Sequence, residues 1–413
     1  MPPKLRDGSI LFTALRGGYL SALNSIAVLP SEGGEVRQLI PNATSPQLAG
    51  PGAIVFAQGT SLVAAAFDSH ALQLTGEPRA LGVQVQTTLL SGAPMYALAD
   101  NGTLVYAEPA PGRQLIWVNR RGGEELVKTD AKMYFGLRLS PDGTRVATSI
   151  ADADRDLWVL GLDGKLVQRL TLGPAPDAMP VWSRDSSEIF YTSGQRNIYR
   201  IPADRSRLPE FILGLNPPER IHGLSITPDG KRLLTHWDIL PDGVDLRVVE
   251  LGPKTVTKLI GDSLSENDGQ LSPDGKWLVY QSAESIGGRE GQIVVRPFPD
   301  VRAHQWVISP GLGRQPMWSR DGREIFYRTE DGTVMSVRVR TTPSFSYDTA
   351  VPVVTPRLTL STPGTGPTYD VSSDGRRFLF IRAPEMDIRS LTVILNWDVE
   401  VNAAIAGTGV TTR

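Results

Sequence analysis

One short phrase recurs along this chain, and no other feature limits its fold so tightly. Residues 271–280 read LSPDGKWLVY and residues 318–327 read WSRDGREIFY. The turn glycine of the phrase, or a residue in its place, occurs at Gly8, Gly52, Gly102, Gly143, Ser186, Gly230, Gly275, Gly322 and Gly375. Successive copies lie 41 to 53 residues apart, a period of about 44. That period suits four short strands and their turns, which is the unit of a β-propeller blade.

The chemistry of the phrase explains its recurrence. Proline presets the backbone for a turn, aspartate accepts hydrogen bonds from the backbone ahead of it, and glycine takes the positive φ of a tight hairpin. A strand rich in aromatic and β-branched residues follows at once, as in EIFYTS at 188–193. No window shows sustained helical periodicity, so we expect an all-β fold. The turn aspartates obey the repeat and are interpreted as structural; they are Asp142, Asp185, Asp229, Asp274, Asp321 and Asp374.

The repeat count predicts the architecture. Nine turn positions enclose eight complete intervals, so we expect one β-propeller of eight four-stranded blades over residues 1–413. The N-terminal piece lacks a robust first strand, and the C-terminal piece lacks an obvious fourth. The N- and C-terminal strands are therefore expected to share a blade and close the ring, because closure removes exposed sheet edges. Seven blades with extra strands, or part of a longer tandem array, are the alternatives.

The repeat units also resemble a known family. LSPDGTRVA, WSRDSSEIFY, LSPDGKWLVY and WSRDGREIFY resemble the TolB-like, WD40-like propeller repeat of bacteria. The runs QLIWVNRRG, IVVRPFPD and VILNWDVEV look like the extracytoplasmic propeller of certain bacterial serine/threonine kinases. The likeness covers about residues 5–400 and rests on turn and strand residues. The phosphate-binding loop, His-Arg-Asp and Asp-Phe-Gly segments of a kinase are absent from the sequence, so the resemblance implies a sensing or docking module without kinase activity.

Composition and charge exclude several other classes of function. The chain has 42 basic and 44 acidic residues and no basic run interleaved with aromatics, so we expect no nucleic-acid partner. It has no cysteine, which excludes disulfides and thiolate sites. No apolar stretch reaches transmembrane or signal-peptide length, so we expect no membrane insertion, and the sequence as written points to the cytoplasm. The family resemblance instead implies a periplasmic location. We expect a monomer that binds a protein, a peptide or a small molecule.

Histidine is scarce, and one of its positions stands out. The sequence has no GxSxG, HExxH, phosphate-loop or EF-hand motif. His70 and His304 lie in polar connections and are interpreted as surface residues. His222 precedes the first strand of its unit, in ERIHGLSITPDG. In a propeller that position lines the mouth of the central channel, where equivalent residues of all blades converge.

The same position in the other units predicts a polar ring at the channel mouth. It is occupied by Gln47, Met95, Tyr134, Asp177, His222, Glu266 with Asp268, Arg314 with Gln315, and Thr368 with Tyr369. From this set, the residues predicted to bind a ligand are Tyr134, Asp177, His222, Arg314, Gln315 and Tyr369. An oxygen-rich ring can hold a hard cation such as calcium. The candidate metal ligands are Asp177, Glu266 and Asp268.

Two functions of different classes follow. The first is a non-catalytic propeller that binds a protein, peptide or small ligand at the channel mouth. The second is a metal-assisted hydrolase of esters, lactones or phosphotriesters, with His222, Glu266 and Asp268 as its catalytic residues. His236 and Asp238 share a strand face and form a second candidate acid–base pair, although a loop hydrogen bond is the commoner reason for such a pair. Ser225 and Ser272 precede turns in the repeat, which favours a structural role.

Overall fold

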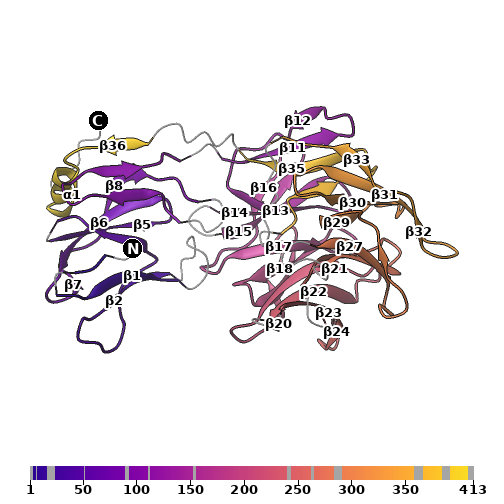
Figure 1. The fold of residues 1–413 in the computed structure, drawn as a ribbon, viewed down its shortest axis with the longest axis horizontal. Coiled ribbons are helices and arrows are strands. Elements are labelled where there is room, and N and C mark those ends of the chain that lie inside the picture. The colour runs from indigo at the N-terminus through magenta and orange to yellow at the C-terminus, as the bar shows by residue number, and fades with distance from the viewer. Residues whose placement is uncertain are drawn as a thin grey trace.

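In the computed structural model, the described residues form almost entirely antiparallel β-strands, arranged in nine sheets. It describes residues 3–5, 7–15, 24–50, 52–88, 93–109, 112–151, 155–239, 243–261, 265–282, 291–357, 366–383 and 391–407. The predicted β-propeller fold is confirmed. Figure 1 shows the sheets in two groups, six toward one end of the molecule and three toward the other. Within the described residues, no helix is long and apolar enough to cross a membrane.

Six of the sheets make up what we call the ring, and they are numbered here in order around it. Ring sheet 1 joins β11 (Gln114–Asn119), β12 (Glu124–Leu126), β34 (Tyr369–Val371) and β35 (Arg377–Arg382). Ring sheet 2 has β13 (Tyr134–Leu139), β14 (Arg145–Ala151), β15 (Arg155–Gly161) and β16 (Val167–Arg169). Ring sheet 3 has β17 (Asp177–Trp182), β18 (Glu188–Ser193), β19 (Asn197–Pro202) and β20 (Glu210–Gly214).

The other three ring sheets follow the same four-strand plan. Ring sheet 4 has β21 (Arg220–Ile226), β22 (Arg232–Ile239), β23 (Gly243–Glu250) and β24 (Val256–Ile260). Ring sheet 5 has β25 (Glu266–Leu271), β26 (Trp277–Ser282), β27 (Gln292–Pro297) and β28 (Trp306–Val307). Ring sheet 6 has β29 (Arg314–Trp318), β30 (Glu324–Arg328), β31 (Val334–Arg340), β32 (Ser346–Tyr347) and β33 (Val351–Val354).

The remaining three sheets form what we call the arc. The first has β1 (Ile10–Ala14), β2 (Ser25–Leu29) and β3 (Arg37–Pro41). The second has β4 (Thr44–Leu48), β5 (Ala53–Gln58), β6 (Ser61–Asp68), β7 (Gln73–Leu74) and β8 (Arg79–Gln84). The third has β9 (Tyr96–Leu98), β10 (Leu104–Tyr106) and β36 (Thr392–Ile394). One helix, α1 (Asp398–Ile405), follows β36 and contacts β6 and β8.

The hydrophobic cores show that the ring is closed and the arc is open. Each neighbouring pair of ring sheets encloses one cluster of buried side chains, including the pair formed by sheets 6 and 1. In that closing pair, Met317 and Phe326 of sheet 6 pack against Phe378 and Phe380 of sheet 1. The described part of the arc has two such clusters for its three sheets. A closed ring leaves no sheet face uncovered between blades, whereas an arc ends on two outer faces.

The expected eight-bladed ring is not confirmed. Every turn position of the repeat has its own sheet, but six sheets close on themselves and three do not. Closure does combine strands that are distant in sequence, as expected, but these are β11 and β35, in antiparallel register from Gln114 opposite Arg382 to Asn119 opposite Arg377. The C-terminal strand β36 instead pairs with β10 in the arc. Counting the repeats cannot detect this division, because the ring sheets and the arc sheets contain the same repeated turn.

Helix α1 was not anticipated from the sequence either. Its Val401 and Ala404, with Trp397 just before it, are buried in the arc core shared with Val55 and Leu104. The helix is only eight residues long, and a segment that short carries too few turns for its periodicity to be read with certainty.

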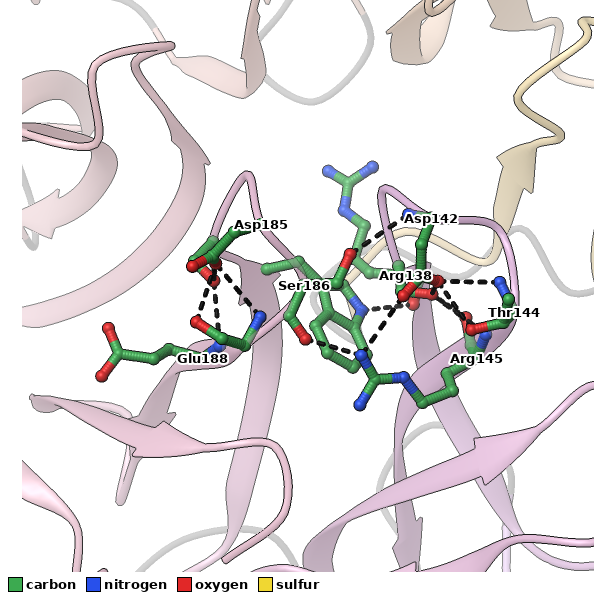
Figure 2. Close-up of polar contacts among 11 residues, drawn as sticks. Arg138, Asp142, Thr144, Arg145, Asp185, Ser186 and Glu188 are labelled. Carbon is green, nitrogen blue, oxygen red and sulfur yellow. Dashed lines mark hydrogen bonds and ion pairs between the residues drawn. The ribbon is translucent and has the colours of Figure 1, made fainter. Parts of the chain in front are cut away.

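The predicted structural role of the repeated turn is confirmed by its hydrogen bonds. In ring sheet 2, Ser140 Oγ donates to Asp142 Oδ1 at 2.6 Å, and the same oxygen accepts the Thr144 N–H at 2.9 Å. Equivalent turn bonds occur at Ser183, Thr227, Ser272, Ser319 and Ser372. Figure 2 shows neighbouring turns joined as well: Asp142 N–H donates to Ser186 Oγ at 3.1 Å, and Arg145 Nη2 donates to the Ser186 carbonyl at 2.6 Å.

Ser225 and Ser272, for which the sequence favoured a structural role, also hold the blades in place. Ser272 Oγ donates to Asp274 at 2.5 Å and accepts the Trp277 N–H at 3.0 Å within its turn. Ser225 Oγ accepts the Leu271 N–H at 3.3 Å from the neighbouring sheet. Their contacts therefore support the structural interpretation.

Candidate functional site

The innermost strands of the ring, β34, β13, β17, β21, β25 and β29, surround a central channel with two ends. We call the end where these strands begin the start mouth, and the end where they run into the repeated turns the turn mouth. The start mouth contains a cavity of about 520 Å³ lined by residues of ring sheets 2 to 6 together with Gly366. Cavities of about 300 to 1,000 Å³ are the usual size for binding small ligands.

β-Bulges decide which side chains face the start mouth. The register of each innermost strand from β13 through β29 shifts by at least one residue against its partner strand. Met179, Asp268 and Gln315 lie within three of these bulges, have φ values of 57°, 52° and 53°, and line the cavity. A bulge re-aims a side chain that regular alternation would send elsewhere. The same feature in successive blades thus brings three different side chains to one opening.

Two histidines form the wall of the cavity in ring sheet 4. His222 of β21 and His236 of β22 are directly opposite each other, with ring centroids 4.8 Å apart in an edge-to-face arrangement. Burial lowers the pKa of His236 to about 4. Burial, together with the charges of His236 and Arg220, lowers the pKa of His222 well below its ordinary value. Both imidazoles are therefore neutral at pH 7 and can each donate one hydrogen bond and accept another.

Charged groups flank the imidazoles. Arg220 Nη1 lies 3.9 Å from Asp238 Oδ2, so the carboxylate suggested as an orienting partner for His236 forms an ion pair with Arg220 instead. Asp268 Oδ2 accepts the Gln315 N–H at 3.3 Å. Burial raises the pKa of Asp268, while this hydrogen bond and the nearby guanidinium groups of Arg138 and Arg314 oppose that rise. The two neutral imidazoles thus lie between cationic and anionic groups.

The structure brings four of the predicted site residues together. His222, Asp268, Arg314 and Gln315 all line the start-mouth cavity. Gln315 is held firmly, since its Oε1 accepts the Thr368 hydroxyl at 3.0 Å and its carbonyl accepts the Tyr369 hydroxyl at 2.9 Å.

Other predicted residues lie elsewhere. Tyr134 and Tyr369 are buried in the cores between blades, and the Tyr134 hydroxyl donates to the Asp130 carbonyl at 2.6 Å. Glu266 is buried at the start of β25 and does not line the cavity, because Asn267, one residue along, takes the channel-facing position. Asp177 lines a different cavity with Tyr191 and Ser193.

Two predicted mouth residues belong to the arc, so they are absent from the ring. Gln47 joins two arc sheets, with its Nε2 donating to the Tyr96 carbonyl at 3.2 Å and its Oε1 accepting the Leu98 N–H at 2.6 Å. Met95 precedes β9 in the same group. Their assignment to the mouth followed from the single-ring expectation and is wrong for the same reason.

The predicted metal ligands are not gathered. Asp177, Glu266 and Asp268 are all among the described residues, and in that part of the chain no three histidine or carboxylate side chains are close enough to hold a metal ion together. One blade position can point its side chain into the channel or into a blade interface, depending on the bulge beside it.

Several cavity residues were missed from the sequence. Arg220 lines the cavity two residues before His222 on the same strand, so strand alternation alone could have identified it. Arg155 begins β15, and Gln281 lies near the end of β26. No sequence signal marked these two, because they come from second and third strands whose ends meet the channel only in the folded ring.

Comparison with known proteins shows the fold. A TolB-type protein from Agrobacterium tumefaciens matches with a TM-score of 0.50 at 18% identity, covering 66% of this chain and 98% of that one. The uncharacterized peptidase YuxL of Bacillus subtilis is 28% identical over 174 residues, which are 40% of this chain and 25% of the relative. The Tol-Pal system protein TolB of Anaeromyxobacter dehalogenans is 43% identical over 49 residues, 12% of this chain and 11% of the relative. No family model matches. The chain thus spans a quarter or less of these curated relatives, and activity has to be argued from the site.

Proposed function

We propose that this TolB-like β-propeller is a non-catalytic binding module that recognises a polar segment of a protein or peptide in its start mouth. The observation that carries the proposal is the cavity of about 520 Å³, to which five consecutive ring sheets contribute side chains. It contains groups suited to hydrogen bonding an extended chain: two neutral imidazoles, the side chains of Asn267 and Gln281, and paired charges.

The arrangement favours binding over hydrolysis. Asp238 is paired with Arg220, and Asp268 accepts a backbone N–H from Gln315, so neither carboxylate is placed to orient an imidazole as a general base. The metal-assisted alternative relied on Asp177, Glu266 and Asp268 acting together, and their side chains lie in different environments. No observation of the site favours that second function.

The proposal is tested by selecting peptides from a random display library against the whole protein. Enriched peptides are then titrated into wild type and into a variant with His222→Gln, His236→Gln and Arg314→Met. We expect binding to weaken at least tenfold in the variant, because roughly 1.4 kcal/mol of lost polar contact is a tenfold change in affinity. Arg376→Ala, at an exposed turn position on the opposite face of the ring, is the matched control and should bind as wild type.

Two results would contradict the proposal. Peptides that bind the triple variant as tightly as wild type, or a library that yields no enrichment, would remove the start mouth as a recognition site. A thermal melt of each variant checks that the ring is intact.

We also propose that the protein acts outside the cytoplasm. The support is its resemblance to extracytoplasmic propellers together with the TolB match; the cytoplasmic expectation, drawn from the absence of a visible signal peptide, receives no support from either. Fractionation of cells that produce the natural protein tests this, and recovery with cytoplasmic markers would contradict it.

A further inference from the structure

The turn mouth, at the other end of the channel, gathers positive charge. All six ring sheets contribute to a small cavity of about 80 Å³ there. Three arginines line it, Arg138 of sheet 2, Arg184 of sheet 3 and Arg320 of sheet 6, and Asp370 is the one carboxylate among the described residues that line it. Arginine is the side chain best suited to bind an oxyanion, since it presents five N–H donors in a planar fork.

The arginines break the repeat at a defined position. The residue directly before the turn aspartate is proline at Pro141 and Pro273, which also line this cavity, but it is arginine at Arg184 and Arg320. The turn itself is unchanged, because Ser319 Oγ still donates to Asp321 at 2.7 Å. Arginine is therefore not needed for the turn, and its presence at two of these positions calls for another role.

Both turn arginines are fixed across the opening. Arg184 Nη2 donates to the Pro273 carbonyl at 2.9 Å, from sheet 3 to sheet 5. Arg320 Nη2 donates to the Leu139 carbonyl at 3.3 Å, from sheet 6 to sheet 2. Each bond uses one of five donors, so the guanidinium groups are held in place with most of their N–H groups still available. Figure 2 shows the Arg138 guanidinium directed away from the hydrogen bonds of the neighbouring turns.

The charge at this mouth is only partly offset by the protein. Within the described residues, none of the three guanidinium groups has a carboxylate oxygen within ion-pair distance. Asp370 accepts two backbone N–H groups, from Leu139 at 2.9 Å and from Val371 at 2.7 Å. Burial lowers the pKa of Arg138, and the charges of Asp370 and Asp268 oppose that shift, so one carboxylate in the lining faces three guanidinium groups. Burial and the charge of Arg320 lower the pKa of Arg184, which reflects the cost of holding cations together.

From this geometry we infer that the turn mouth is a binding site for a single oxyanion group, a phosphate or a carboxylate, held by Arg138, Arg184 and Arg320. The cavity is small enough that one such group fills it, and a larger ligand would have to remain outside. Charge-assisted hydrogen bonds from several fixed guanidinium groups are the strongest way to hold such a group. The inference concerns the opposite end of the channel from the proposed peptide site and does not depend on it.

Inorganic phosphate is the first probe, titrated into the whole protein by calorimetry at low salt. We expect saturable binding in wild type, with a loss of roughly tenfold in affinity for each arginine removed by Arg184→Met or Arg320→Met. Methionine keeps the unbranched aliphatic stem while removing the charge. Arg184→Pro and Arg320→Pro form a second pair of variants, which introduce the residue found at Pro141 and Pro273 in the equivalent turns. If the methionine and the proline variants both lose binding, the loss cannot be explained by misfolding of one kind of variant.

A second arm separates the sources of the oxyanion. A short peptide ending in glutamate is titrated in the same way; tighter binding than phosphate assigns the site to an acidic group of a larger ligand, and phosphate binding alone assigns it to a free ion. Arg376→Ala is the control and should leave both affinities unchanged. The inference is overturned if neither probe binds wild type, or if the arginine variants bind both probes as wild type does.

Discussion

The ring and the arc share the same sequence repeat, yet they are stabilised differently. In the ring, every sheet packs against two neighbours, and six cores follow one another without a gap. In the described part of the arc, three sheets share two cores, and segments from the far end of the chain complete it: β36 pairs with β10 of the third sheet, and α1 contacts β6 and β8 of the second. The comparison shows that one blade sequence can serve a closed or an open array, and that contacts distant in sequence decide which.

The largest effect is expected from separating the two regions. A fragment of residues 112–383 contains every strand of the ring, so it should fold and unfold cooperatively by calorimetry. Residues 1–109 alone lack Ile394, which pairs with Leu104, and Trp397, which is fully buried in the arc core. We expect that fragment to stay largely unfolded by circular dichroism. A folded 1–109 or an unfolded 112–383 would show that the two regions are not separable in this way.

A matched pair of core truncations sharpens the comparison. Phe380→Ala in the ring and Trp397→Ala in the arc each remove a fully buried aromatic side chain, at a cost of about 3–5 kcal/mol. If the regions unfold independently, calorimetry should show two transitions, with each substitution lowering a different one. A single transition shifted by both variants would instead mean that ring and arc unfold as one unit.

Acid should weaken the ring more than the arc. The folded-state pKa of His236 is about 4, below the ordinary value near 6.5, so between these limits the unfolded chain binds a proton that the folded chain does not. Stability is therefore lost as the pH falls through this window, by about 3 kcal/mol for a shift of this size. His222→Gln with His236→Gln should flatten the dependence measured by denaturant titration. His70→Gln, at an exposed position in the arc, is the control and should leave it unchanged.

Asp177, in the same ring, should have the opposite effect, so that its contribution to stability increases as the pH falls. Burial raises its pKa to about 6, and among the described residues its Oδ1 has no hydrogen-bond partner. Because this folded-state pKa lies above the unfolded value, the charged carboxylate costs stability at pH 7, and that cost disappears as the pH falls through 6. Asp177→Asn should raise the free energy of unfolding by about 1–3 kcal/mol at pH 7. An increase that is as large at pH 4.5 as at pH 7 would contradict the electrostatic origin.

The smallest expected effect concerns the turn phrase itself. Asp142→Ala removes the acceptor for Ser140 and Thr144 and should cost about 1 kcal/mol in the ring transition. The equivalent change in the arc, Asp7→Ala, removes bonds to Ser9 at an exposed turn and should have a smaller effect on the arc transition. Equal effects in the two regions would show that the turn, rather than its packing in the closed ring, accounts for the stability.

Part of the site could be predicted from the sequence. His222, Asp268, Arg314 and Gln315 were identified because the repeat fixes which residue begins each innermost strand, and all four line the start-mouth cavity. Asp177 and Glu266 were equally well placed by that rule, but the local bulge and strand alternation send their side chains away from the channel. A shift of one residue reverses the face of a strand, and the sequence carries no mark of where the shift occurs.

The sequence by itself determined the blade: its strands, its turn chemistry and its period all follow from local preferences of proline, aspartate, glycine and β-branched residues. Only the tertiary structure decided how many blades close into a ring, because closure depends on β11 meeting β35, whose residues are more than 250 positions apart. It also brought residues of LSPDGKWLVY and WSRDGREIFY to the same end of the channel. Their shared residues build the turn, whereas Pro273 of one and Arg320 of the other line the same cavity, where only the arginine brings a positive charge and N–H donors.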